Sequence, residues 1–290
     1  MTRYGLIKRL KTNKVDREEY FKRLETLYIK KGLKKSFKEQ YMNAEGHELE
    51  GKFYSGISSS RLCFELFSWM AEDDGIEDIE FECYLPGLKS ANGHKVPQPN
   101  MDVYYDDGNI NFIESKFTET SDNLKDSISK NYYDYYLDGS NNVGKQLLEI
   151  CKIRFDGNII FAKHFITLIN NIMTYAEENN LFGKKDWFDL KQEVTHIFGI
   201  GQFIYKEHPK KNICFINLVY DFKYPTSQLA LKFKELANAM MKKYIGELEL
   251  NICFKYDFKY MQEYVKTIDL NRNAYASKKT IKEILSEFYL

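Results

Sequence analysis

The feature that most constrains the fold is a pair of strand-like segments joined by a short polar turn. Residues Met101 to Tyr105 and Ile110 to Phe117 are rich in β-branched and aromatic side chains, as strands are. Between them, Asp106-Asp107-Gly108-Asn109 is a strong turn signal. The pattern predicts a β-hairpin, and the register of its pairing decides which side chains share a face.

Three charged residues lie on this hairpin. Side chains alternate along a strand, so Glu114 and Lys116 share one face and lie on the order of 7 Å apart. A three-residue loop, 107–109, would set Asp102 opposite Glu114, whereas a two-residue Asp-Gly turn would place the two carboxylates on opposite faces. If both carboxylates belong to one site, we therefore expect the hairpin to have the longer loop or a β-bulge.

Two neighbouring carboxylates beside a lysine have a chemical use. Burying them is costly unless a cation compensates, and Mg²⁺ prefers one or two carboxylates together with waters and phosphate oxygens. The lysine can orient a metal-bound water and stabilise charge that develops on phosphorus. An acid-x-Lys tripeptide is also expected roughly five times by chance at this composition. A solvated amphipathic hairpin therefore stays open as the alternative.

At these residues the chain resembles the PD-(D/E)XK, or restriction-endonuclease-like, nuclease superfamily. Asp102 matches the first acid of the motif, and Glu114-Ser115-Lys116 matches its second part. The resemblance implies that Asp102, Glu114 and the backbone carbonyl of Ser115 hold Mg²⁺, with Mn²⁺ able to substitute, and that Lys116 positions the attacking water. The chain departs from the motif because Met101, and not proline, precedes Asp102.

The same resemblance implies two supporting residues. A helix before the strands often supplies another acid in that superfamily, and Glu65 is the conspicuous acid of an apolar helix that Ser58 would cap. A later helix often carries a glutamine, and Gln146 lies near the start of one. Glu65 would ligate a second metal or orient the first, and Gln146 would steady Lys116 or a phosphate. The alternatives are a partly exposed helix acid and an ordinary helix-surface or capping glutamine.

The pattern as a whole predicts an α/β fold with a mixed central sheet flanked by helices and an N-terminal helical addition. The resemblance implies that the core is restriction-endonuclease-like. Residues 1–50 form the predicted addition and residues 51–290 the nuclease domain with helical insertions, in one compact unit. Further strands are expected at Ile79–Tyr84, Ile213–Tyr220 and Leu248–Tyr256, and further helices at Asn158–Glu178 and Thr226–Tyr244. The resemblance itself covers residues 55–150 and, more loosely, 213–220.

Composition excludes some classes of protein. The chain has no signal-peptide pattern and no run of about 20 apolar residues, so we expect a cytoplasmic protein without a membrane partner. Its formal net charge is zero, which argues against indiscriminate polyanion binding but permits local basic patches, such as Lys8 to Lys38. The alternative for that segment is a solvated helical face. The five histidines show no metal-ligand spacing, and no histidine site is predicted.

The leading hypothesis is therefore a Mg²⁺-dependent endonuclease that hydrolyses phosphodiester bonds in duplex DNA, of restriction or genome-defence type. A homodimer is a possible form, because one metal site cuts one strand. Three alternatives remain: a nuclease of the same fold acting on RNA or on repair or recombination structures in DNA, a non-catalytic nucleic-acid-binding protein that retains the fold, and an unrelated α/β protein. Carboxylates on opposite faces of the sheet would favour the last of these.

Overall fold

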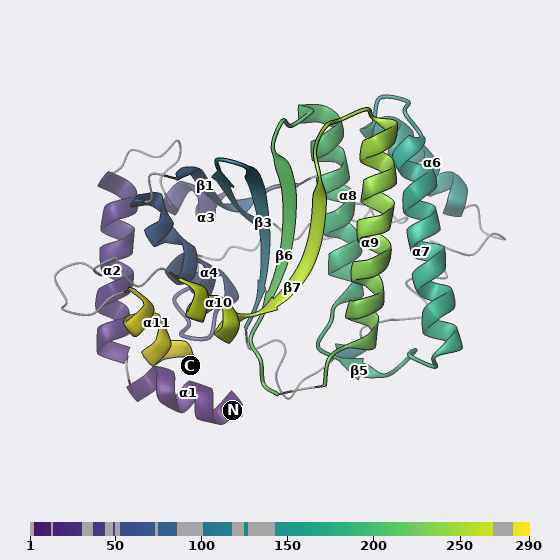
Figure 1. The fold of residues 1–290 in the computed structure, drawn as a ribbon. Coiled ribbons are helices and arrows are strands. Elements are labelled where there is room, and N and C mark those ends of the chain that lie inside the picture. Colours follow the sequence, from purple (N-terminus) through teal and green to yellow (C-terminus); the bar gives the residue numbers. More distant parts are fainter. Residues whose placement is uncertain are drawn as a thin grey trace.

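A five-stranded mixed sheet forms the centre of the molecule in the computed structural model, with the strand order β1-β2-β3-β6-β7 (Figure 1). The structure describes residues 3–12, 14–30, 37–43, 49, 53–72, 75–85, 101–117, 125–126, 143–223, 225–268 and 281–290. β1 (Ile76–Cys83), β2 (Met101–Asp106) and β3 (Asn109–Lys116) form an antiparallel meander, and β6 (Asn212–Val219) and β7 (Phe254–Tyr260) continue the sheet in parallel to β3. The predicted α/β class with a mixed sheet and flanking helices is confirmed.

Helices cover both faces of this sheet (Figure 1). On one side lie α6 (Val143–Arg154), α7 (Ile160–Glu178), α8 (Leu190–Glu207) and α9 (Gln228–Glu247). On the other side lie α1 (Arg3–Thr12), α2 (Lys14–Lys30), α3 (Phe37–Met42), α4 (Ser59–Phe67), the 3-10 turn η2 (Ser68–Glu72), α10 (Met261–Thr267) and α11 (Ile281–Tyr289). A small second sheet joins β4 (Lys125–Asp126) to β5 (Lys185–Asp186). None of the helices in these ranges is long and apolar enough to cross a membrane.

Each face of the sheet has its own hydrophobic core. Val103, Phe112 and Phe215 pack under the helices on the α8 side, whereas Ile113 and Leu218 pack under α4. β3 is buried along most of its length because helices cover both of its faces. The N-terminal helices contribute to the α4-side core through a set of fully or nearly buried side chains, namely Leu6, Leu10, Phe21, Leu24 and Tyr41.

The register of the hairpin contradicts the longer loop predicted for it. Tyr105 pairs with Ile110 and Asp102 pairs with Ile113, so the turn is shorter by one residue and the Asp102 and Glu114 side chains lie on opposite faces. The Asp106 carboxylate favours this turn, because its Oδ1 accepts the backbone N–H groups of Gly108 at 3.0 Å and Asn109 at 2.7 Å. A shift of one residue in β2 would also move Val103 out of the α8-side core.

Two further elements differ from the expectation. The last strand begins at Phe254 rather than at residue 248, because α9 continues to Glu247 and Glu249 then takes a left-handed conformation with φ 55°. The chain also forms an 18-residue helix, α8, where no element was predicted. This helix decides the composition of the candidate site.

Candidate functional site at the carboxyl ends of the parallel strands

The carboxyl ends of β3 and β6 meet at the lower end of the sheet in Figure 1, where α8 begins. Ligands of open α/β sheets bind characteristically at such strand ends. Lys116 is the last residue of β3, and Glu114 precedes it on the same face, which α8 covers. Charged side chains from β3 are therefore held against the first turns of α8.

Four side chains form one hydrogen-bonded group, called the Glu114 cluster: Glu114, Lys116, Gln192 and His196. Lys116 Nζ lies 2.9 Å from Glu114 Oε1 and also donates to Gln192 Oε1. Gln192 Nε2 donates to Glu114 Oε1 at 2.8 Å, and His196 Nε2 lies 3.0 Å from Glu114 Oε2. Because Gln192 and His196 are four residues apart on α8, both reach the same carboxylate.

The electrostatics of this cluster keep Glu114 ionised. Burial alone would raise the pKa of Glu114, but the ammonium of Lys116 and the imidazole of His196 outweigh burial and lower that pKa to about 2. The Lys116 side chain is 17% exposed, whereas that of His196 is 1% exposed. Lys116 can therefore touch a ligand directly, and His196 can act only through Glu114.

Asp102 and Ser115 lie on the other face of the sheet, against α4. Asp102 Oδ1 accepts the backbone N–H of Glu82 at 2.9 Å, and the Ser115 hydroxyl lies 3.3 Å from the backbone carbonyl of Ser59. Burial and the nearby charge of Asp102 raise the pKa of the Cys63 thiol on α4. The structure therefore does not bring the Asp102 carboxylate to the Glu114 cluster.

Glu65 belongs to a buried ion cluster on the α4 side. Its carboxylate lies 2.9 Å from Arg17 Nε and 2.8 Å from Arg61 Nε, and it also accepts the hydroxyl of Tyr289. Its side chain is fully buried, and two guanidinium groups and a phenol surround it. Glu65 thus ties α2, α4 and α11 together, and it is not part of the Glu114 cluster.

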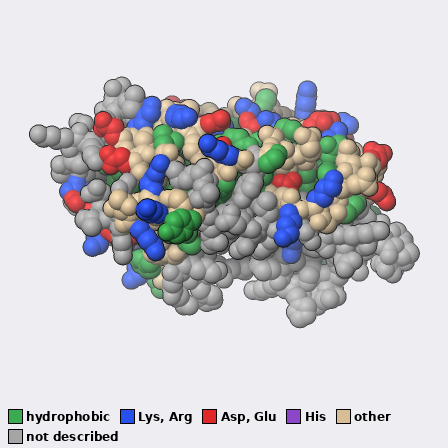
Figure 2. All heavy atoms as spheres, turned by 90° about the horizontal axis from the view of Figure 1, so that it is seen from below, with side chains coloured by type: hydrophobic (Ala, Val, Ile, Leu, Met, Phe, Trp, Pro, Cys, Tyr) green, Lys and Arg blue, Asp and Glu red, His purple; other side chains and the backbone are tan. Residues whose placement is uncertain are grey.

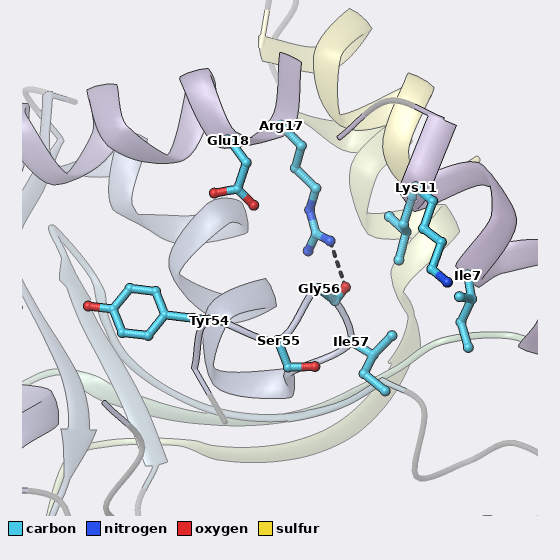
Figure 3. A pocket seen from close by; sticks show the side chains of 9 residues that line it. Ile7, Lys11, Arg17, Glu18, Tyr54, Ser55, Gly56 and Ile57 are labelled. Atoms are coloured by element: carbon cyan, nitrogen blue, oxygen red, sulfur yellow. Dashed lines mark hydrogen bonds between the residues drawn. The ribbon is translucent and has the colours of Figure 1, made fainter. Parts of the chain in front are cut away.

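A cavity of about 320 Å³ lies next to this ion cluster. Figure 3 shows Arg17 on one side of it, with Nη1 donating to the Gly56 carbonyl at 2.6 Å, and Lys11 and Ile7 on another. The remaining lining includes Glu18, Ser55 and Ile57. The lining contains no member of the Glu114 cluster, so this cavity is separate from the candidate site.

The supporting glutamine of the cluster is Gln192. Gln146 lies on α6, but its side chain is outside the described residues. The pattern Asp189-Leu-Lys-Gln192 carries a capping-box signal that points to a helix start, and in the structure the Asp189 carboxylate accepts the N–H of Gln192 at 3.2 Å. No comparable signal marks His196, because its contact with Glu114 exists only once α8 packs on the sheet.

The metal arrangement that the resemblance implies does not fit this site. It requires Asp102 and Glu114 on one face, and the hairpin register separates them. Within the described ranges no group of three or more His, Cys, Asp and Glu side chains is placed to hold a metal ion. The side chains that do converge on Glu114 are a lysine, a glutamine and a histidine.

A second polar group lies beneath the cluster, between α8 and the sheet. Asn217 Nδ2 donates to Glu193 Oε1 at 2.6 Å, while Glu193 Oε2, Asn217 Oδ1 and the Tyr256 hydroxyl are buried without a hydrogen-bond partner among the described residues. Burial and the charge of Glu114 raise the pKa of Glu193 well above its ordinary value. Burial and the neighbouring carboxylate of Glu114 both favour the neutral form of this side chain, so we assign Glu193 as a neutral acid.

Replacing Glu193 with glutamine should therefore stabilise the protein at neutral pH. A raised pKa in the folded state contributes stability at low pH that is lost as the pH rises past the ordinary range of glutamate. The neutral amide of Glu193→Gln avoids that loss, by about 1.4 kcal/mol for each unit by which folding raises the pKa. Melting temperatures measured at pH 5 and pH 8 should show a gain that grows with pH. A gain that does not change with pH would contradict a protonated Glu193.

Comparison with known proteins found no matching protein-family model, curated protein or solved structure.

Proposed function

We propose that this chain is a nuclease that hydrolyses phosphodiester bonds in DNA, with Lys116 as the residue that contacts the phosphate. The observation that carries the proposal is the Glu114 cluster: a partly exposed lysine held in place by a buried glutamate and a glutamine, at the carboxyl ends of parallel strands. The first turn of α8 lies beside it, and the partial positive charge of a helix N-terminus favours a phosphate there.

The sequence resemblance supports the same reading. It implies a helix before the catalytic strands, where α4 lies, and a glutamine on a later helix, which the sequence assigned to Gln146. The glutamine that contacts Glu114 among the described residues is Gln192. A restriction-endonuclease-like core is part of this proposal. So is a role in restriction or genome defence in the cytoplasm, with a homodimer supplying the two sites that a double-strand cut requires.

Each member of the cluster has a task in this proposal. The ammonium of Lys116 binds a non-bridging phosphate oxygen and stabilises the negative charge that grows on it during attack by water. Glu114 pairs with Lys116 and orients it, Gln192 contacts both side chains, and His196 holds the second carboxylate oxygen. The phosphate-binding task of Lys116 does not depend on Mg²⁺, the cofactor that the resemblance implies and that the placement of Asp102 and Glu114 on opposite faces does not fit.

The test is cleavage of plasmid and single-stranded DNA by the wild-type protein and by Lys116→Ala, with Mg²⁺, Mn²⁺ and EDTA in parallel. We expect the variant to cut at least about 100-fold more slowly, because it loses the stabilising charge. Lys255→Ala is the matched control, since Lys255 is a 69% exposed lysine on β7. Equal cutting by the wild type and Lys116→Ala would overturn the proposal. RNA and branched DNA assayed side by side would identify the preferred substrate.

A nucleic-acid-binding protein without nuclease activity is the second candidate. The placement of Asp102 and Glu114 on opposite faces favours it, because this placement separates the two carboxylates that a shared Mg²⁺ would need. The same placement also favours the alternative that the chain is an unrelated α/β protein whose hairpin matches the motif by chance. Calorimetric titration with Mg²⁺, read together with DNA binding and cleavage, discriminates between the candidates. A protein that binds DNA but neither binds the metal nor cuts DNA would support the second candidate. Metal-dependent cutting would exclude it.

A further inference from the structure

We infer that the end of the molecule around Lys116 is a binding face for the phosphodiester backbone of duplex DNA. The face, called the basic face, is defined by five exposed lysines at this end: Lys8, Lys11, Lys184, Lys185 and Lys223. None of these five forms an ion pair within the part of the chain that the structure describes. The choice of DNA as the partner rests on the proposed function.

The lysines of the basic face come from elements on both sides of the sheet. Lys8 and Lys11 come from α1, on the α4 side of the sheet, whereas Lys184 and Lys185 shortly precede α8 and Lys223 follows β6. These elements all lie at the lower end of the molecule in Figure 1, around the strand end that carries Lys116. Figure 2 views the molecule from below, and Lys and Arg side chains recur across that view from one side to the other.

Three acidic groups at this end accept local hydrogen bonds, whereas Glu177 and Glu178 at the end of α7 are exposed. Asp189 caps α8 through the N–H of Gln192, Asp186 accepts the Ser227 hydroxyl at 2.5 Å, and Asp221 accepts the N–H of Lys223 at 2.6 Å. Their oxygen atoms are therefore directed to the protein's own donors. The five lysines of the basic face are exposed, so a phosphate can replace water at them, and Lys11 also lines the cavity beside Arg17.

The chemistry of the basic face fits a duplex better than a single strand. Lysines bind phosphates without reading sequence, and regularly spaced phosphates suit several scattered ammonium groups. Single-strand binding relies on successive exposed aromatic side chains for base stacking, and the exposed aromatic side chains described on and beside α1 are two, Tyr4 and Tyr54.

The experiment measures binding in EDTA, so that cleavage cannot contribute. Fluorescence anisotropy of a labelled mixed-sequence duplex is recorded over a salt series for the full-length wild type and for two double variants, Lys8→Glu with Lys11→Glu and Lys184→Glu with Lys185→Glu. We expect each double variant to bind about 10-fold or more weakly and with a shallower salt dependence, its slope lower by about one unit for each phosphate that it no longer neutralises. The control is Lys242→Glu with Lys243→Glu, an equal charge change at exposed positions near the C-terminal end of α9.

The control variant should bind within about twofold of the wild type. The inference is overturned if the wild type does not bind duplex at low salt, or if the control loses as much affinity as the two variants. It is also overturned if single-stranded DNA or phosphatidylserine vesicles bind through the same lysines and duplex does not. If the protein binds duplex DNA as expected but cuts it under no condition, the basic face is supported and the nuclease proposal is excluded. If it cuts DNA in a metal-dependent way and both double variants bind as tightly as the wild type, the nuclease proposal is supported and the basic face is excluded.

Discussion

Replacing Glu65 with alanine is expected to lower the free energy of unfolding by about 3–5 kcal/mol. The variant leaves the guanidinium groups of Arg17 and Arg61 buried without their shared counter-charge, and it takes an acceptor from Tyr289. Arg17 keeps its bond to the Gly56 carbonyl, and Arg61 keeps its ion pair with Glu18 at 2.9 Å, but neither replaces a carboxylate held between two arginines. Urea denaturation followed by circular dichroism measures the change.

Two further variants make this result specific. Glu19→Ala removes a 63% exposed acid that pairs with Arg23 on α2, and it should change stability by no more than about 0.5 kcal/mol. Glu65→Gln keeps one acceptor oxygen and should lie between alanine and the wild type. Wild-type stability in Glu65→Ala, combined with an absence of DNA cleavage, would contradict the structural role and return Glu65 to the catalytic site that the resemblance implies.

The Gly201→Ala variant is expected to be less stable by about 1–3 kcal/mol. A Cβ added to Gly201 on α8 would lie 2.1 Å from Cε2 of the Phe161 ring on α7. That ring is fully buried and stacks on Phe155 and Phe165 at centroid distances of 4.7 and 5.3 Å, so it cannot move aside without disturbing the core. Thermal denaturation measures the decrease.

Gly246→Ala on α9 is the matched control. No atom of the described residues lies within 4 Å of the added Cβ there, and alanine favours helix, so this variant should gain up to about 1 kcal/mol. Equal effects of the two substitutions would mean that α8 does not pack closely on α7. Because α8 also carries Gln192 and His196, Gly201→Ala should in addition slow any DNA cleavage at temperatures where the variant is still folded.

Local sequence signals predicted several elements well. The apolar segments at Asn158–Glu178 and Thr226–Tyr244 lie close to α7 and α9, and the hairpin forms where the Asp-Gly turn and its flanking strand residues indicate it. Glu114 and Lys116 share a face as predicted, because alternation along a strand is a property of the backbone alone. Ser58 caps α4 at the predicted place.

Which residues form the site could not be predicted from any single segment of the sequence. The register of β2 against β3 depends on how Asp106 closes the turn and on which side chains the two cores accept, and it decided that Asp102 faces α4. Gln192 and His196 come 76 and 80 residues after Lys116 in the chain and reach Glu114 only because α8 packs on the sheet. Likewise, the Glu65 carboxylate forms ion pairs with two arginines from different helices.

The sequence by itself therefore determined the α/β class, the hairpin and the pairing of Glu114 with Lys116, since these follow from backbone periodicity and local turn chemistry. Only the tertiary structure decided which acids, amides and imidazoles converge on Lys116. Those interactions join segments far apart in the chain, and their energies depend on burial and on neighbouring charges that exist only after the helices have packed.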